Sequence, residues 1–327
     1  MKLRAWSAAA ACGAVLVLAA AAWSPAGTYI RSLGDGELRA AMAASDADQS
    51  LLDQIRKQAP GRSVPPIDAS VDRWFRAIPG YEGREVDVEA SYRATLQRPE
   101  DGLTFRYKPV APAKKLADFP LEPVYKGNPA KPAASLMINV AWGNEYLEPM
   151  LETLRRSGVK ATFFLDGSWL KRYPELALRI KEGGHEIGNH AYTHPDMSKL
   201  GEAEQKSQIE RTSSLIEQTL GVKSLYFAPP SGSFNALTVK TAREQGMTTV
   251  LWTLDTVDWM KPRPEAVLAK ISRGLKPGSL VLMHPTYASS QALQGIIDSA
   301  KQKGLVLGPV SQTLSEARLD GSVESGR

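Results

Sequence analysis

The side chains best suited to acid–base or metal chemistry lie in the second half of the chain. All four histidines fall there, at positions 185, 190, 194 and 284, and the first third of the chain has none. His190 and His194 are four residues apart, and on a helical turn that spacing points both rings to one side. Two neutral imidazoles so placed can hold zinc or a similar borderline metal. The alternative is a pair of partly exposed polar histidines.

The histidines follow segments with the pattern of a parallel sheet. From residue 135 onward, short apolar runs alternate with longer helical segments. The expected strands cover residues 136–140, 161–165, 185–188, 225–227, 249–254 and 280–283. The expected helices cover residues 146–157, 169–182, 202–220, 236–245, 264–273 and 290–303. This alternation predicts an α/β domain with a parallel sheet or barrel, whose working groups lie at the carboxyl ends of the strands.

Short motifs around these histidines resemble those of a known family. Residues 183–190 (GGHEIGNH) and 194–198 (HPDMS) look like the second motif of NodB-homology polysaccharide deacetylases, which are carbohydrate esterases. The other matching segments are residues 161–165, 255–259 and 282–284. The matches follow the family's order, and we assign the domain to residues 133–316. The resemblance implies an α/β fold, a distorted (β/α) barrel of the NodB type.

The resemblance also implies a chemistry, the removal of acetyl groups from N-acetylated sugars of peptidoglycan or chitin. In the family, an Asp and two His bind a metal, which polarises the acetyl carbonyl and activates water. By position, His190 and His194 match the two metal histidines. His284 matches the general acid, and Asp258 matches the carboxylate that orients it. Without the resemblance, Asp258 would read as a surface turn carboxylate.

Three further residues match the family's substrate groove. Trp259 and Leu282 match walls of the groove and of the acetyl pocket, with plain core packing as the alternative. Ser231 stands where the third motif has Tyr, although its backbone N–H could still point into an oxyanion site.

Two motifs depart from the family at the positions that carry its chemistry. The first motif reads Thr-Phe-Asp-Asp-Gly in the family and NVAWG at residues 139–143 here. The position of the catalytic base is therefore Ala141, and that of the metal aspartate is Trp142. Ala228 replaces the Arg of the third motif, which orients the base. The resemblance thus implies a zinc-like divalent metal site that is weakened or absent.

Glu145 is the nearest carboxylate that could substitute, three residues after Trp142. One hypothesis makes it a third metal ligand or the base. The alternative is a carboxylate in the first turn of a helix, which the helix dipole stabilises.

The amino-terminal residues predict a targeting segment. Lys2 and Arg4 precede a small-apolar run at residues 8–22, the pattern of a signal peptide, which we assign to residues 1–26. An uncleaved membrane anchor is the alternative. The single cysteine, Cys12, lies in this run, so a cleaved chain would have no thiol and no disulfide.

Three segments complete the predicted organisation. Residues 27–108 predict a small α+β domain of unknown role, with helices near 38–58 and 71–78 and a strand over 86–95. Residues 109–132 are rich in proline and predict a semi-rigid linker. Residues 317–327 predict a flexible tail.

The charge balance limits the classes of partner that the chain can bind. The net charge is +5, from 40 basic and 35 acidic residues that are spread along the chain. Nucleic-acid binding needs a basic face or stripe, which the sequence lacks. We expect a cell-wall glycan, peptidoglycan, as the partner and contact with a membrane only through the amino-terminal segment. The oligomeric state is not predicted.

Residues 138–146, 65–68 and 77–81 resemble a YlxY-like, sporulation-associated branch of these deacetylases. The branch implies a location outside the cytoplasmic membrane, secreted or anchored, in the forespore envelope. Three functions stay open: a deacetylase with weak or no activity by the family mechanism, a non-catalytic pseudoenzyme that binds a glycan or a partner, and a scaffold that acts through its first domain.

Overall fold

The computed structural model describes residues 35–319, with side chains from residue 46 onward. The predicted signal peptide or anchor at residues 1–26, with Cys12, lies outside the described residues, as does most of the predicted tail at 317–327. Within the described part of the chain, no helix has the length and apolar character that a membrane span requires. The chain divides into two compact units.

The smaller unit includes the described chain up to Ser63 and Glu85–Lys108. Its helices are α3 (Asp35–Arg62), α4 (Val88–Gln97) and the 3-10 helix η1 (Pro99–Asp101). The strand predicted over residues 86–95 is wrong, because α4 covers most of it. Asp87 caps α4 by accepting a hydrogen bond from the N–H of Ala90 at 2.8 Å. Such a cap stabilises a helix by about 1 kcal/mol, which favours a helix here over the strand predicted from the short apolar alternation.

Residues 64–84 group with the larger unit, whereas the sequence predicts them as part of the first domain. They hold a hairpin of β1 (Ser70–Asp72) and β2 (Arg76–Ile78), so the helix predicted over 71–78 is wrong. The carboxylate of Asp72 accepts hydrogen bonds from the N–H groups of Trp74 and Phe75, which closes the turn. Two further strands, β3 (Gly83–Val86) and β4 (Tyr107–Val110), form a separate two-stranded sheet.

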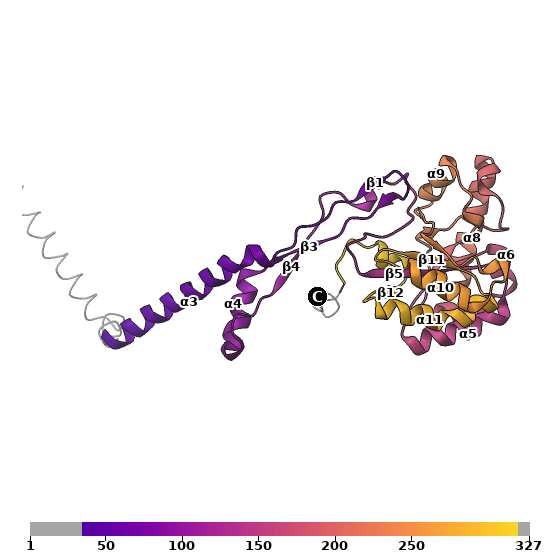
Figure 1. The fold of residues 1–327 in the computed structure, drawn as a ribbon. Helices are drawn as coiled ribbons and strands as arrows, with labels where there is room; N and C mark the ends of the chain where they lie inside the picture. The colour runs from indigo at the N-terminus through magenta and orange to yellow at the C-terminus, as the bar shows by residue number, and fades with distance from the viewer. Residues whose placement is uncertain (1–34, 320–327) are drawn as a thin grey trace, which may run out of the picture. The chain divides into compact units, whose positions relative to one another are not determined.

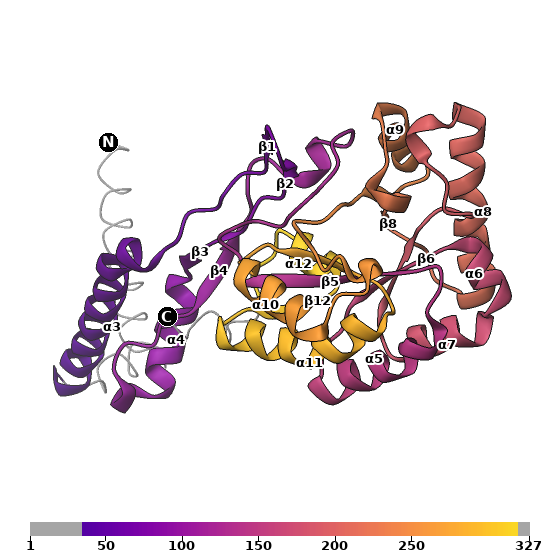
Figure 2. The ribbon, with the colours of Figure 1, turned by 45° about the vertical axis from the view of Figure 1, so that its right-hand side comes forward.

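The larger unit is built on an eight-stranded sheet of parallel neighbours, in the order β10-β11-β5-β6-β7-β8-β9, with β12 paired to the start of β5. Its strands are β5 (Ala133–Val140), β6 (Thr162–Leu165), β7 (Glu186–Asn189), β8 (Tyr226–Phe227), β9 (Thr248–Thr249), β10 (Leu254–Asp255), β11 (Leu280–Met283) and β12 (Val306–Gly308). The sheet curls and helices surround it (Figures 1 and 2). This arrangement confirms the predicted α/β fold, a distorted (β/α) barrel.

The helices of the larger unit follow the predicted order, and α12, which was not predicted, comes after the last strand. They are α5 (Asn144–Ser157), α6 (Gly167–Arg172), α7 (Pro174–Glu182), α8 (Glu202–Leu220), α9 (Ala236–Glu244), α10 (Pro264–Gly274), α11 (Tyr287–Gln302) and α12 (Val310–Leu314). The single helix predicted over residues 169–182 is two helices, because Pro174 lacks the backbone donor that would continue the first. Helices α5, α11 and α10 lie side by side along the sheet (Figure 2).

The central strand β5 is buried at every residue, and alternate side chains enter different layers. Leu136, Ile138 and Val140 pack in the cluster that joins the sheet to the helices. Met137 instead packs inside the curl with Phe164 and other apolar residues of neighbouring strands. Asn139 belongs to this inner set, because side chains two residues apart share one face.

The proline-rich segment at residues 109–132, predicted as a linker, is anchored within the larger unit. It contains the 3-10 helix η2 (Leu116–Asp118). Val124 is fully buried and bridges to Val250. The ammonium of Lys131 donates to the carbonyls of Gln312 and Ser315 at 2.6 and 2.8 Å, and Lys131 is only 1% exposed.

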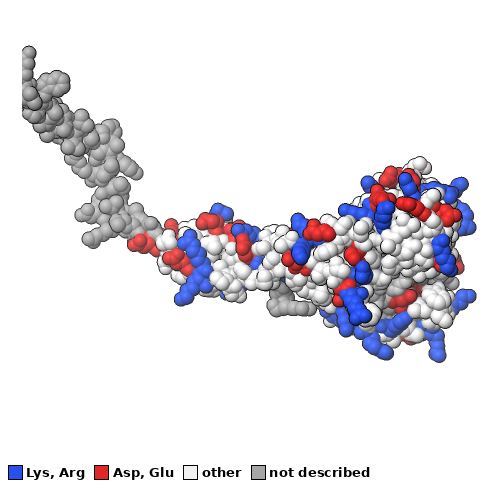
Figure 3. Space-filling view, turned by 90° about the horizontal axis from the view of Figure 1, so that it is seen from above, with Lys and Arg blue, Asp and Glu red and all other residues white. Residues whose placement is uncertain are grey.

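Acidic and basic side chains are interspersed on the visible face of the larger unit (Figure 3). That face shows no continuous basic stripe, in keeping with the spread of charge along the sequence.

Candidate functional site

The structure brings the predicted site residues to one edge of the sheet. Ala141 and Trp142 follow the carboxyl end of β5, and His190 follows β7. His284 follows β11, and Asp258 begins the 3-10 helix η5 (Asp258–Met260) after β10. This is the edge at which (β/α) barrels gather their functional groups, because the loops there vary without disturbing the sheet.

A cavity of about 410 Å³ opens at this edge. The residues that line it are Asn139, Trp142, His194, Ser231, Trp252, Asp255, Trp259, Leu282 and His284. Six of these were predicted from the sequence as site or altered-motif positions. We call this the histidine pocket.

His284 is held by Asp258, which is completely buried. One carboxylate oxygen lies 2.7 Å from Nδ1 of His284, and the other accepts the backbone N–H of His284 at 2.7 Å and the hydroxyl of Ser289. Burial alone would raise the pKa of Asp258, but these hydrogen bonds and the charge of His284 outweigh it and lower that pKa. The carboxylate thus stays ionised and fixes the imidazole, which leaves Nε2 as the ring nitrogen free for chemistry.

The indole of Trp142 covers one face of this imidazole. The two ring centroids are 5.6 Å apart and the planes differ by 12°, which is a stacked arrangement. The backbone makes this approach possible at Gly143, which has φ 84°. A Cβ on Gly143 would lie 1.9 Å from the carbonyl oxygen of Pro285, so only glycine lets the loop after β5 pack on the loop after β11.

His190 and His194 also meet, although not through the helical turn that their spacing suggested. Both Ala191 and His194 adopt positive φ, and no helix spans them. The two ring centroids are 5.1 Å apart. His190 is buried and its Nδ1 donates to the carbonyl of Ala228 at 2.7 Å, so Nε2 carries the lone pair. Burial lowers the pKa of His190 to about 3, with a smaller effect of His194, and keeps the ring neutral.

A third metal ligand is missing from the described residues. Between residues 35 and 319 no group of three His, Cys, Asp or Glu side chains is placed to hold a metal ion. The charge of Asp166 acts on His194, and Oδ1 of Asp166 caps α6 by accepting the N–H of Trp169 at 2.8 Å. Trp142 offers an indole in place of a carboxylate. The residues present therefore do not fit the family's metal, and we derive no step through one.

The third-motif positions are apolar or exposed. Ala228 is fully buried and packs in the inner cluster with Met137 and Phe164. Ser231 lies in the 3-10 helix η4 (Pro230–Gly232) with φ 54°, and its side chain is exposed at the histidine pocket.

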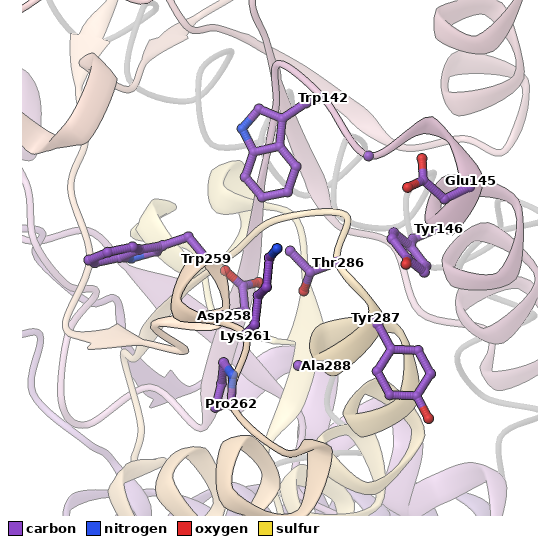
Figure 4. Close-up of a pocket in the computed structure, with 11 residues that line it drawn as sticks. Trp142, Glu145, Tyr146, Asp258, Trp259, Lys261, Pro262, Thr286, Tyr287 and Ala288 are labelled. Carbon is purple, nitrogen blue, oxygen red and sulfur yellow. The ribbon is translucent and has the colours of Figure 1, made fainter.

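Glu145 lies in the first turn of α5 and is exposed. It does not line the histidine pocket. It lines a second cavity of about 610 Å³, which we call the lysine pocket after Lys261 (Figure 4). Trp142 and Trp259 border both cavities.

Sequence reasoning missed several residues that the structure places here. Asn139 is 3% exposed, and its Oδ1 is buried without a hydrogen-bond partner among the described residues. A polar residue inside the apolar run 136–140 was the signal that could have revealed it. Lys261 and Tyr287 carried no such signal, because exposed Lys and Tyr are common on any surface. His185 lies at the opposite end of β7, where Nδ1 accepts the N–H of Ala161, so it stands apart from the other three histidines.

Comparison with known proteins gives consistent matches. Residues 126–250 match the family model described as polysaccharide deacetylase. Over 273 residues the chain is 44% identical to YlxY of Bacillus subtilis (strain 168), which covers 82% of this chain and 85% of that protein. It is 35% identical over 165 residues to a peptidoglycan-N-acetylglucosamine deacetylase of Bacillus cereus, covering 49% of this chain and 60% of that enzyme.

Among solved structures, the chain resembles BA3943, described as a CE4 family pseudoenzyme from Bacillus anthracis. The TM-score is 0.77 with 41% identity, over 82% of this chain and 96% of that one. A mutant of BA3943 with restored enzymatic activity matches with a TM-score of 0.77 and 39% identity, over 82% of this chain and 99% of that one.

Proposed function

The chain belongs to the polysaccharide deacetylase family, and from that premise we propose that it binds an N-acetylated cell-wall glycan without deacetylating it by the family mechanism. The observation that carries this proposal is the stack of Trp142 on His284. An indole and the methyl of Ala141 follow β5, where the resemblance expects the metal aspartate and the base. Loss of a general base alone costs roughly 10²–10⁴-fold in rate.

The hydrogen bonds between Asp258 and His284 support the predicted acid half of the site. Asp258 holds His284 through two contacts of 2.7 Å. A general acid assists the attack of a nucleophile, and without a base to activate water the site has no such nucleophile. A second candidate function, weak residual deacetylation, rests on this pair alone. Glu145 does not rescue it, since its side chain lines the other cavity.

The histidine pocket has the features of a binding site. Its volume of about 410 Å³ suits a single sugar substituent, and Trp259 is 56% exposed on its rim. The pyranose ring of a glycan has an apolar C–H face that packs on such an indole. The unpartnered amide oxygen of Asn139 can accept the N–H of an acetamido group. We infer from the exposed indole and the unpartnered amide oxygen that the glycan is N-acetylated, as in peptidoglycan.

The proposed setting is the outer face of the cytoplasmic membrane, secreted or anchored, in the forespore envelope. The resemblance of residues 65–68, 77–81 and 138–146 to the sporulation-associated branch supports it.

Acetate release from N-acetylated peptidoglycan fragments tests the proposal, with zinc content measured on the same protein. We expect acetate release at background, zinc well below one equivalent, and measurable binding of the fragments by calorimetry. Zinc-dependent acetate release by the natural chain would refute the proposal and favour the second candidate.

A restoring variant supplies the matched control. Ala141→Asp, Trp142→Asp and Ala228→Arg together return the residues that the resemblance expects. We expect acetate release above that of the natural chain, and its loss again when His284→Ala is added. The second result ties any restored activity to the surviving acid.

A further inference from the structure

We propose that the lysine pocket binds a saccharide unit bearing a carboxylate, next to a unit whose acetamido group enters the histidine pocket. The inference rests on the proposed function and names its ligand class, an acidic glycan in place of a neutral one. It assigns a role to residues that the resemblance leaves without one: Lys261, Tyr146 and Tyr287.

The lysine pocket is built from three segments that meet at the carboxyl edge of the sheet. Its lining comes from the start of α5, from η5 with the residues that follow it, and from the start of α11. The volume of about 610 Å³ is in the range of pockets that take small molecules. A hexose ring with a substituent fits that space, whereas the histidine pocket is smaller.

Aromatic rings line the lysine pocket and remain open to solvent. Trp142, Trp259 and Tyr287 are 45%, 56% and 58% exposed, although large aromatic side chains usually bury most of their surface. Tyr146 supports Tyr287 in an edge-on contact, with ring centroids 6.5 Å apart. Several exposed aromatic rings around one hollow mark a binding site more often than a chance surface. Flat apolar rings beside polar groups suit a pyranose.

Lys261 supplies the charge. It follows η5 in a left-handed conformation, with φ 54°, and its side chain extends into the pocket with the amine toward Trp142 (Figure 4). Its ammonium has no ion pair or hydrogen bond with any residue between 46 and 319. A positive φ is uncommon for a residue with a side chain. At this turn the positive φ of Lys261 occurs together with a side chain whose ammonium extends between the aromatic rings of the pocket.

Two carboxylates also line the lysine pocket, and they limit the charge of the ligand. Asp258 is committed to His284 and Ser289, so it cannot pair with Lys261. Glu145 is exposed in the first turn of α5 and can accept sugar hydroxyls. Glu145 repels any anion, so one ammonium in a pocket that also holds one exposed carboxylate favours a ligand with a single negative charge over a polyanion such as a phosphodiester polymer.

The two cavities share Trp142 and Trp259 as walls, so one glycan can occupy both. An acetamido group near Asn139 and a carboxylate near Lys261 would then belong to adjacent sugar units. This pattern is that of a peptide-free glycan strand in which an N-acetylated amino sugar alternates with the same sugar carrying a lactyl ether, because the lactyl carboxylate is charged only where no peptide is attached to it.

The test compares three peptide-free tetrasaccharides that differ only in the group read by Lys261. The first alternates N-acetylglucosamine and N-acetylmuramic acid, the second is the same chain with its lactyl carboxylates converted to methylamides, and the third is chitotetraose. Binding to the full chain is measured by calorimetry at 50 and 300 mM NaCl. We expect the acidic ligand to bind more tightly than its amide, with that advantage falling at high salt.

Lys261→Gln removes the charge and Lys261→Arg retains it, while Lys270→Gln removes an exposed charge on the outer helix α10 as the control. We expect Lys261→Gln to weaken the acidic ligand roughly three- to tenfold and to leave the amide and chitotetraose unchanged. Lys261→Arg should preserve most of the preference, and Lys270→Gln should change nothing. Melting temperatures of all variants establish that they are folded.

The outcomes separate the two proposals. If the natural chain binds the tetrasaccharides but Lys261→Gln affects all three equally or none, this inference is overturned and the proposed function stands. If the acidic ligand binds no better than its amide, the inference is overturned as well. If the natural chain binds none of the three, both proposals fail.

Discussion

The indole of Trp142 lies flat on the imidazole of His284, with 5.6 Å between ring centroids and 12° between planes. Asp258 holds the same imidazole by its Nδ1. His284 is thus fixed by a carboxylate at one nitrogen and covered by an aromatic ring on one face. Trp142 in turn forms a wall of both cavities.

Trp142→Ala should weaken glycan binding more than it weakens the fold. The indole is 45% exposed, so its loss removes little core packing, and the stack on His284 contributes about 1 kcal/mol. Binding of the acidic tetrasaccharide should fall about tenfold, because both cavities lose a wall. Calorimetry and urea unfolding check the two effects. Leu225→Ala, which removes a 54% exposed side chain at the opposite end of the sheet, should leave binding unchanged.

Gly143→Ala should disturb the same stack through the backbone. The new Cβ would meet the carbonyl of Pro285 at 1.9 Å, and φ 84° disfavours any side chain. We expect a loss of about 2–3 kcal/mol in the free energy of unfolding, together with weaker glycan binding. Gly158→Ala is the matched control: its φ is 67°, but no atom lies within 4 Å of the added Cβ. It should cost only about 1 kcal/mol, and equal losses would contradict the steric argument.

Asp258→Asn should destabilise the folded chain by about 3 kcal/mol at pH 7, because it removes a buried carboxylate that accepts hydrogen bonds from His284 and Ser289. In the natural chain burial raises the pKa of Asp258, but the hydrogen bonds and charge of His284 lower it overall. A lowered folded pKa gives stability that is present above the unfolded pKa of about 4 and is lost as pH falls through the folded value. Urea unfolding between pH 6 and 2 should therefore show a shallower acid dependence for Asp258→Asn. Asp298→Asn, on the exposed face of α11, should change stability by less than about 0.5 kcal/mol.

His185, which lies outside the candidate site, should make the free energy of unfolding depend on pH. Burial first, and the charge of Lys160 second, lower its pKa to about 4. The unfolded chain takes up a proton near pH 6.5 while the folded chain does not, so stability is full above that pH and falls as pH drops toward 4. His185→Gln should reduce the slope of the free energy of unfolding in that window by up to roughly 1.4 kcal/mol per pH unit. Above pH 7.5 the slope should not change; a proton NMR titration of His185 near 6.5 would contradict the assignment.

The sequence was a good guide where periodicity and motifs agreed. Apolar runs such as 280–283 are too short for helices and are buried on both sides, so they specify parallel strands whatever their neighbours. In the first hundred residues it was right about the helix near 38–58, which lies within α3, and wrong about the segments 71–78 and 86–95. There the alternation at 86–92 competed with the cap at Asp87, and the spacing of Val71, Trp74 and Phe75 suited a helix as well as a hairpin. Local spacing alone cannot rank such alternatives, because tertiary contacts decide between them.

By itself, the sequence determined the family, the α/β fold and the set of side chains at the carboxyl edge. The residues that follow each strand can be read directly from the sequence once the strands are located. It also showed that Ala141 and Trp142 follow β5 in place of two carboxylates. Only the tertiary structure decided where those side chains lie: Trp142 on His284, Glu145 in a different cavity from the histidines, and Lys261 among aromatic rings. Such distances join loops far apart in the chain, and packing between loops is set by shape and by single residues such as Gly143, which no periodicity encodes.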